Sequence, residues 1–365
     1  MLHPTIMPKT FIELGILVLL ALASFFVIIS FTNAPAVELA SGITASTVND
    51  QPVFSTAFWG TKIKTMGMQE AYTFLAETIK GMDDYGQHLN AHQFGDALFK
   101  IKHADGVVAC DNRFGHGCFH QFFITALNKE GAGIATKLTK VCADKLGPGP
   151  QNHACNHGIG HGIMAAFNWE DIKGALEVCK SFQNKNAFFA CIDGVFMEYF
   201  TPTALVAKGK TESIRDVDRK SPDSACISLE PLFQANCYSM AVSWWMTAGV
   251  SARDAGKWCG DVKGEKNYEA CFKGLGYALV LASRYNKNVV IKKCEEATAA
   301  AEEKVFCRAG AHWGFSKGEE VGEVLTEEDK ALCDFEEKKW CLKESSLTDS
   351  GLGISAICCP DLKSL

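Results

Sequence analysis

The chain has 365 residues, of which 47% are hydrophobic and 21% are charged, and its formal net charge is −6. This composition is too apolar for a chain that is disordered as a whole, and the length allows one large core or two ordinary ones. The acidic balance, with no Lys/Arg-rich run and no phosphate-binding loop, argues against a nucleic-acid partner.

The first segment, residues 1–33, is predicted to be an N-terminal membrane anchor. Leu14 to Phe31 is 18 residues of almost uninterrupted apolar character, close to the roughly 20 residues that span a bilayer. Lys9 precedes this run and the nearest charge after it is Glu38, which favours an N-terminus inside and the bulk of the chain outside. We therefore expect a single-pass protein of the cell membrane whose bulk is extracytoplasmic. The alternative is a signal peptide cleaved at the small residues around Asn33 to Ala36.

The next segments divide the rest of the chain. Residues 34–65 are rich in Ala, Ser, Thr and Pro and are predicted to be a linker. Helical spacing of apolar residues begins at about Met66, for example across Gln69 to Lys80. We expect a helical domain over residues 66–345 and a cysteine-containing tail over residues 346–365.

The helical domain contains an internal repeat that is marked by cysteines. Six of them recur at intervals of 37, 36, 46, 34 and 36 residues: Cys118, Cys155, Cys191, Cys237, Cys271 and Cys307. A further copy without the cysteine begins at Gly86. A period of about 36 residues predicts stacked helical hairpins, each of which buries the apolar face of its neighbour.

A second cysteine precedes most of these by a nearly constant gap, and Cys110 precedes Cys118 by a shorter one. This spacing predicts one disulfide bond per hairpin. The expected bonds are Cys110–Cys118, Cys142–Cys155, Cys179–Cys191, Cys226–Cys237, Cys259–Cys271 and Cys294–Cys307. Such bonds require an oxidising compartment, and the absence of any C-x-x-C pair argues against cysteine metal sites. The pairing of Cys333, Cys341, Cys358 and Cys359 stays open.

The expected fold is therefore all-α. It is an array of disulfide-stapled αα-hairpins, either an open solenoid or a closed αα-toroid, behind an N-terminal transmembrane helix. In outline this expected fold resembles the disulfide-stapled helical repeats of the Sel1-like class. The resemblance is limited to architecture, because the cysteine spacing differs. The longest interval contains the charged segment Lys208 to Ser224 and predicts a protruding loop.

Histidines are concentrated in the first half of the array, where eight of the ten lie between His88 and His161. Counted from the repeat cysteine, position +2 holds His88, His120, His157 and Asp193, and position +6 holds His92 and His161. On a helix these two positions share a face, and stacking places equivalent positions of successive hairpins side by side. We expect these six side chains to line one strip of surface, the His/Asp strip.

The His/Asp strip predicts a site for a divalent transition metal, with zinc, iron and copper as the candidates. Two histidines at i and i+4 are a standard pair of ligands from one helix. Glu198 lies one residue round its helix from the strip and is the candidate catalytic general base. The leading hypothesis is an exported, membrane-anchored metalloprotein with oxidase or hydrolase chemistry.

The recurring histidines also have a structural explanation that competes with the metal site, because a histidine at this helical position can instead cap the next hairpin. The protein would then be a non-enzymatic extracellular scaffold that binds a protein or peptide partner. His116 and His153 are expected to lie outside the strip. The three glycines Gly158, Gly160 and Gly162 are expected to permit close helix packing, with room for a ligand as the alternative.

Overall fold

The computed structural model describes residues 46–48, 51–202 and 215–320. The described residues all belong to the compact unit Ala45–Leu365. The predicted anchor, the tip of the predicted loop after α9 and the last four cysteines lie outside the described residues. The described part is all-α apart from one antiparallel pair of short strands, β1 (Ser46–Val48) and β2 (Gln51–Val53).

Three helices open the unit: α2 (Thr56–Met66), α3 (Met68–Ile79) and α4 (Asp84–Lys102). The hydroxyl of Ser55 accepts a hydrogen bond from the Phe58 amide and caps α2. Helix α2 overlaps the second half of the segment 34–65, which was predicted as a linker, and ends at Met66. It is part of the fold because Trp59 and Ile63 are completely buried against the core.

A single helix, α5 (Gly117–Glu130), follows the short 3-10 helices η1 (His103–Ala109) and η2 (Phe114–His116). After η3 (Ala132–Ile134), five hairpins complete the described unit. Their helices are α6 (Ala135–Leu146) with α7 (Pro150–Ala166), α8 (Ile172–Lys180) with α9 (Lys185–Phe200), α11 (Ser224–Ile227) with α12 (Pro231–Thr247), α13 (Ala252–Asp261) with α14 (Glu265–Ala282), and α15 (Lys287–Ala297) with α16 (Ala301–Glu320).

Disulfide bonds join the two helices of each hairpin, and a sixth bond ties the segment before α5 to that helix. The six bonds are Cys110–Cys118, Cys142–Cys155, Cys179–Cys191, Cys226–Cys237, Cys259–Cys271 and Cys294–Cys307. All six predicted pairings are confirmed. Their number favours an oxidising, extracytoplasmic location.

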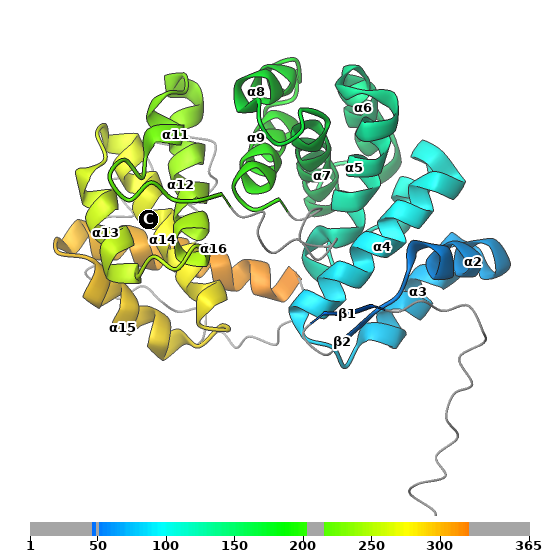
Figure 1. Cartoon of the computed structure of the whole chain (residues 1–365), viewed down its shortest axis with the longest axis horizontal. Coiled ribbons are helices and arrows are strands. Elements are labelled where there is room, and N and C mark those ends of the chain that lie inside the picture. Colours follow the sequence, from blue (N-terminus) through cyan, green and yellow to red (C-terminus); the bar gives the residue numbers. More distant parts are fainter. Residues whose placement is uncertain (1–45, 49–50, 203–214, 321–365) are drawn as a thin grey trace, which may run out of the picture. The chain divides into compact units, whose positions relative to one another are not determined.

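The second helices of the hairpins form an inner layer (Figure 1). Helices α4, α5, α7, α9, α12, α14 and α16 contact one another in that order, and the first helix of each hairpin packs on its own partner. Equivalent positions of successive repeats therefore meet across neighbouring inner helices. This is the arrangement that brings histidines from α4, α5 and α7 together.

Glycines let these inner helices approach closely. A Cβ atom on Gly160 would lie far inside van der Waals contact with the Cys191 carbonyl oxygen, and one on Gly194 would meet the His157 carbonyl. The same relation recurs between α14 and α16, where Gly276 faces the Cys307 carbonyl. The prediction that Gly158, Gly160 and Gly162 permit close packing is confirmed, since each of them faces backbone of a neighbouring helix.

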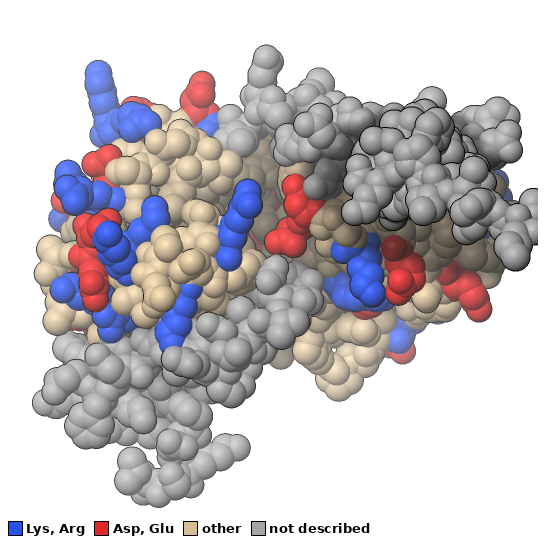
Figure 2. Space-filling view, turned by 90° about the horizontal axis from the view of Figure 1, so that it is seen from below, with Lys and Arg blue, Asp and Glu red and all other residues tan. Residues whose placement is uncertain are grey.

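Acidic and basic side chains of the described residues are mixed on one face of the molecule. On the face seen in Figure 2, Lys and Arg lie beside Asp and Glu and build no extended field of one sign. Of the helices in the described ranges, none has the length and apolar character needed to cross a bilayer.

Candidate metal centre

Six histidines form one cluster, the histidine cluster: His88 and His92 on α4, His116 at the end of η2, His120 on α5, and His157 and His161 on α7. His120 is central. Its ring centroid lies 5.4 Å from that of His88, 5.3 Å from that of His157 and 4.0 Å from that of His161. All five histidines of the predicted strip are in the cluster.

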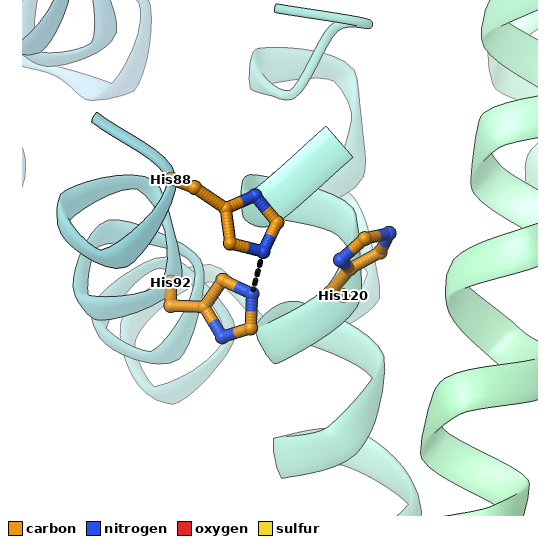
Figure 3. A group of neighbouring side chains, drawn as sticks. All are labelled: His88, His92 and His120. Carbon is orange, nitrogen blue, oxygen red and sulfur yellow. Dashed lines mark hydrogen bonds between the residues drawn. The ribbon is translucent and has the colours of Figure 1, made fainter. Parts of the chain in front are cut away.

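One side of the cluster is a group of three imidazoles that could bind a metal: His88, His92 and His120 (Figure 3). One nitrogen atom from each ring lies within 4.8 Å of the other two. The Nε2 atoms of His88 and His92 are 3.0 Å apart, and two ligands of one tetrahedral ion would be about 3.4 Å apart at usual metal–nitrogen distances. The three rings therefore need only small movements to share an ion.

The orientation of His88 is set from outside the group. Its Nδ1 atom lies 2.7 Å from the carbonyl oxygen of Phe114, and because a carbonyl only accepts, Nδ1 carries the proton. The lone pair is then on Nε2, which faces His92. A metal-binding histidine commonly donates its second ring N–H in this way, which fixes the tautomer and the ring.

The Phe114 carbonyl is supplied by a turn with an uncommon backbone. Phe114, Gly115 and His116 have φ values of 57°, 58° and 63°. The left-handed conformation costs a non-glycine residue about 1–2 kcal/mol. Strain of this kind persists where the surrounding structure imposes it, and it is concentrated at functional sites. Here the same turn orients His88 and places His116 next to the cluster.

His120 is the least satisfied polar side chain of the cluster. It is buried, with 1% of its surface exposed, and neither of its ring nitrogens has a hydrogen-bond partner. A buried polar atom that lacks a partner costs about 1–3 kcal/mol. The buried His120 side chain therefore destabilises the folded state unless its nitrogens bind something else.

A second group that could bind a metal consists of His116, His120 and His157, again with one nitrogen from each ring within 4.8 Å of the others. It shares His120 with the first group. His116 and His157 are half-buried and line the cavity described below.

His161 lies behind the second group and is held by a carboxylate. Its Nδ1 atom donates to Glu198 Oε2 at 2.7 Å, and the indole N–H of Trp169 donates to Glu198 Oε1 at 2.7 Å. On its other side, His161 Nε2 is 3.1 Å from His157 Nε2. Since Nδ1 of His161 carries a proton, a neutral His161 accepts at Nε2 from His157. Glu198, His161 and His157 then form one hydrogen-bonded chain that leads into the second group.

Burial keeps the inner imidazoles in the neutral form that binds metals. Desolvation, together with the neighbouring His161 and His157, holds the pKa of His120 well below its usual range. Desolvation and His88 do the same for the pKa of His92, and burial lowers the pKa of His88 despite the hydrogen bond to Phe114. Unprotonated nitrogen lone pairs are therefore present at neutral pH.

The remaining predicted ligand lies apart from these groups. Asp193 Oδ1 accepts a hydrogen bond from Asn236 Nδ2 at 2.9 Å, and neither three-ligand group found among the described residues includes Asp193 or His161. Asp193 does line the cavity next to the cluster. Its role as a ligand stays a prediction, as does that of Glu198 as a general base.

A cavity of about 600 Å³ adjoins the cluster. One part of its wall is His88, His116, His120 and His157, and much of the rest is aromatic or apolar, including Phe200, Trp244, Tyr277 and Trp313. This volume is in the range of sites for small molecules. Trp245 is completely buried, whereas Trp244 contributes to the cavity wall.

Sequence reasoning missed His116 as a member of the cluster. It lies two residues before Cys118, outside the helical register on which the strip was based, and it reaches the site through the left-handed turn. In the sequence, the only indication that His116 belongs to the cluster is the concentration of histidines between His88 and His161. His153 was also expected outside the strip; it lines the cavity, although neither of the two groups includes it.

Comparisons with protein-family models, with curated proteins and with solved structures found no match to this chain. The functional assignment therefore depends on the chemistry of the histidine cluster and of the cavity beside it.

Proposed function

We propose that this protein is an exported metalloprotein that binds a transition-metal ion through His88, His92 and His120. The observation that carries the proposal is the convergence of three imidazole nitrogens at a buried position, where depressed pKa values keep the rings neutral. Imidazole donors suit zinc, copper and iron better than magnesium or calcium.

The cavity supports a role beyond storage of a metal. His88 and His120 line its wall, so an ion bound by them would have a coordination position that a small molecule could reach. A bound ion of this kind supplies either Lewis-acid activation of water or, if it is redox-active, electron transfer. We infer that the substrate is a small and largely apolar molecule, since aromatic side chains make up much of the wall.

Glu198 and Asp193 have different positions in this proposal. Both oxygens of Glu198 already accept hydrogen bonds, from His161 and Trp169, so we assign it as a positioning residue in place of the general base expected from sequence. Asp193 lies on the cavity wall and is the better candidate for a carboxylate that contacts the substrate.

The stacked hairpins form a repeat array whose inner helices line the cavity. Residues 1–33 hold the chain at the cell membrane with its bulk outside. The apolar run in this segment and the six disulfide bonds support that topology.

Metal content tests the proposal. The full chain, purified in detergent without a polyhistidine tag, should retain zinc, copper or iron after dialysis, and His120→Gln should retain little, because two nitrogen ligands cannot replace three. His103→Gln is the matched control, since His103 is exposed and belongs to neither group. Circular dichroism checks that both variants are folded.

Two results would reject the metal site. One is substoichiometric metal in a folded wild type after incubation with each of the three ions. The other is equal retention by wild type and His120→Gln. Either result would favour the alternative of a non-enzymatic scaffold with a protein or peptide partner.

A further inference from the structure

We infer that His120 bridges two metal ions, one bound by His88 and His92 and the other by His116 and His157. The inference rests on the proposed metal site and extends it, because a single ion would use only one nitrogen of His120.

The first observation is that both nitrogens of the His120 ring are buried and without partners. An ion in the first group satisfies one of them and leaves the other orphaned. In most buried histidines that bind a metal, the second nitrogen donates to a carbonyl or a carboxylate. His88 and His161 have such a partner in the Phe114 carbonyl and the Glu198 carboxylate, whereas His120 has none.

The second observation is that the two ligand groups share this one residue. His88 and His92 form a group with His120, and His116 and His157 form another. In Figure 3, one nitrogen of His120 is directed toward His88 and His92, and the other nitrogen points away from them. A ring so placed can offer one nitrogen to each ion.

Each group also has its own support on the side away from His120. The Phe114 carbonyl orients His88 in the first group. In the second group, His157 is hydrogen-bonded to His161, which is held by Glu198. One nitrogen of His157 lies within 4.8 Å of nitrogens of His116 and His120. Two independently supported pairs on either side of one ring are what a bridged centre needs.

The proton balance of the bridge is simple. A neutral imidazole carries one N–H proton and one lone pair. When both nitrogens bind ions, the ring becomes an imidazolate and its N–H proton is released to solvent, so that one negative charge lies between two cations. This charge offsets part of the repulsion between the ions, which would be about 6 Å apart for usual metal–nitrogen distances.

Copper(II) is the probe that tests the bridge, because its unpaired electron reports on a second ion nearby. The metal-stripped full chain is loaded with copper(II), and copper per chain is measured together with the electron paramagnetic resonance signal at low temperature. We expect two ions per chain and a signal far weaker than two isolated ions would give, since exchange through the imidazolate couples the spins.

Variants of each side make the test specific. The double variant His116→Gln/His157→Gln should bind one copper ion and regain the full signal of one isolated ion. The double variant His88→Gln/His92→Gln should also bind one copper ion, in the second group, and give the full signal of one isolated ion. His153→Gln should match wild type, because His153 lies on the cavity wall but in neither group.

The outcomes separate this inference from the proposed function. One copper ion in wild type that is lost in His88→Gln/His92→Gln but kept in His116→Gln/His157→Gln would overturn the bridge and retain the single-ion site. Two ions with the full signal of two isolated spins would also overturn the bridge. No bound copper, zinc or iron would overturn both.

Discussion

At the scale of single residues, the position of His161 depends on the carboxylate of Glu198. Glu198 is completely buried, and an isolated buried carboxylate would be costly. Two donors compensate for that cost here, the imidazole of His161 and the indole of Trp169. Trp169 has a backbone φ of 60°, so it is a further residue in the left-handed region that supports the cluster.

Replacing Glu198 with Gln should weaken metal binding without removing a ligand. The amide keeps the shape of the side chain but loses the charge that holds the proton on Nδ1 of His161. The tautomer of His161 is then no longer fixed, and neither is the direction of its hydrogen bond with His157. Loss of such an outer partner typically lowers metal affinity about 10–100-fold. Competition with a chelator measures the change. Glu170→Gln, an exposed neighbour of Trp169, is the control, and equal affinities for all three proteins would contradict this role.

At the scale of helices, the distance between inner helices decides whether histidines of different repeats can meet. Gly160 of α7 and Gly194 of α9 each pack against backbone of the other helix, which leaves no room for a side chain. The close contact is what lets Glu198 on α9 reach His161 on α7. Glycine is unfavourable within a helix by about 1 kcal/mol relative to alanine, so its presence here reflects packing.

Gly160→Ala should therefore destabilise the protein by about 3 kcal/mol, as expected for overpacking against backbone that cannot move aside. It should also weaken metal binding, because α9 would be displaced from α7. Gly276→Ala introduces a similar clash between α14 and α16, away from the histidines, and should lower stability alone. Urea unfolding and chelator competition measure the two effects.

A third substitution controls for helix propensity. Gly260 lies in α13 with open space around it, so Gly260→Ala should stabilise the protein slightly, by about 0.5–1 kcal/mol. If Gly160→Ala were as harmless as Gly260→Ala, close packing between α7 and α9 would not be required.

At the scale of the molecule, the disulfide bonds join neighbouring helices into hairpins and the inner helices join the hairpins to one another. Each bond closes a short loop, with separations of 13 residues for Cys142–Cys155 and 12 for Cys259–Cys271. Their entropic contributions should be similar, about 3 kcal/mol each. Their relation to the site differs, since Cys155 lies on α7 with His157 and His161.

Removal of either bond by paired Cys→Ala substitutions should lower the melting temperature to a similar extent. Only the Cys142/Cys155 pair should also reduce metal retention, because it loosens the helix that carries two histidines of the cluster. The Cys259/Cys271 pair serves as the matched control. Equal loss of metal in both proteins would indicate that the site depends on general stability and not on α7.

The sequence by itself determined the hairpins, the six disulfide pairs and the shared face of positions +2 and +6, because cysteine spacing and helical periodicity are local properties of the chain. Only the tertiary structure decided how the ligands group. His116 joins them through a left-handed turn, Asp193 is bonded to Asn236, and Glu198 faces His161 across two packed helices. These relations depend on helix crossings and on single backbone angles, which no linear pattern encodes.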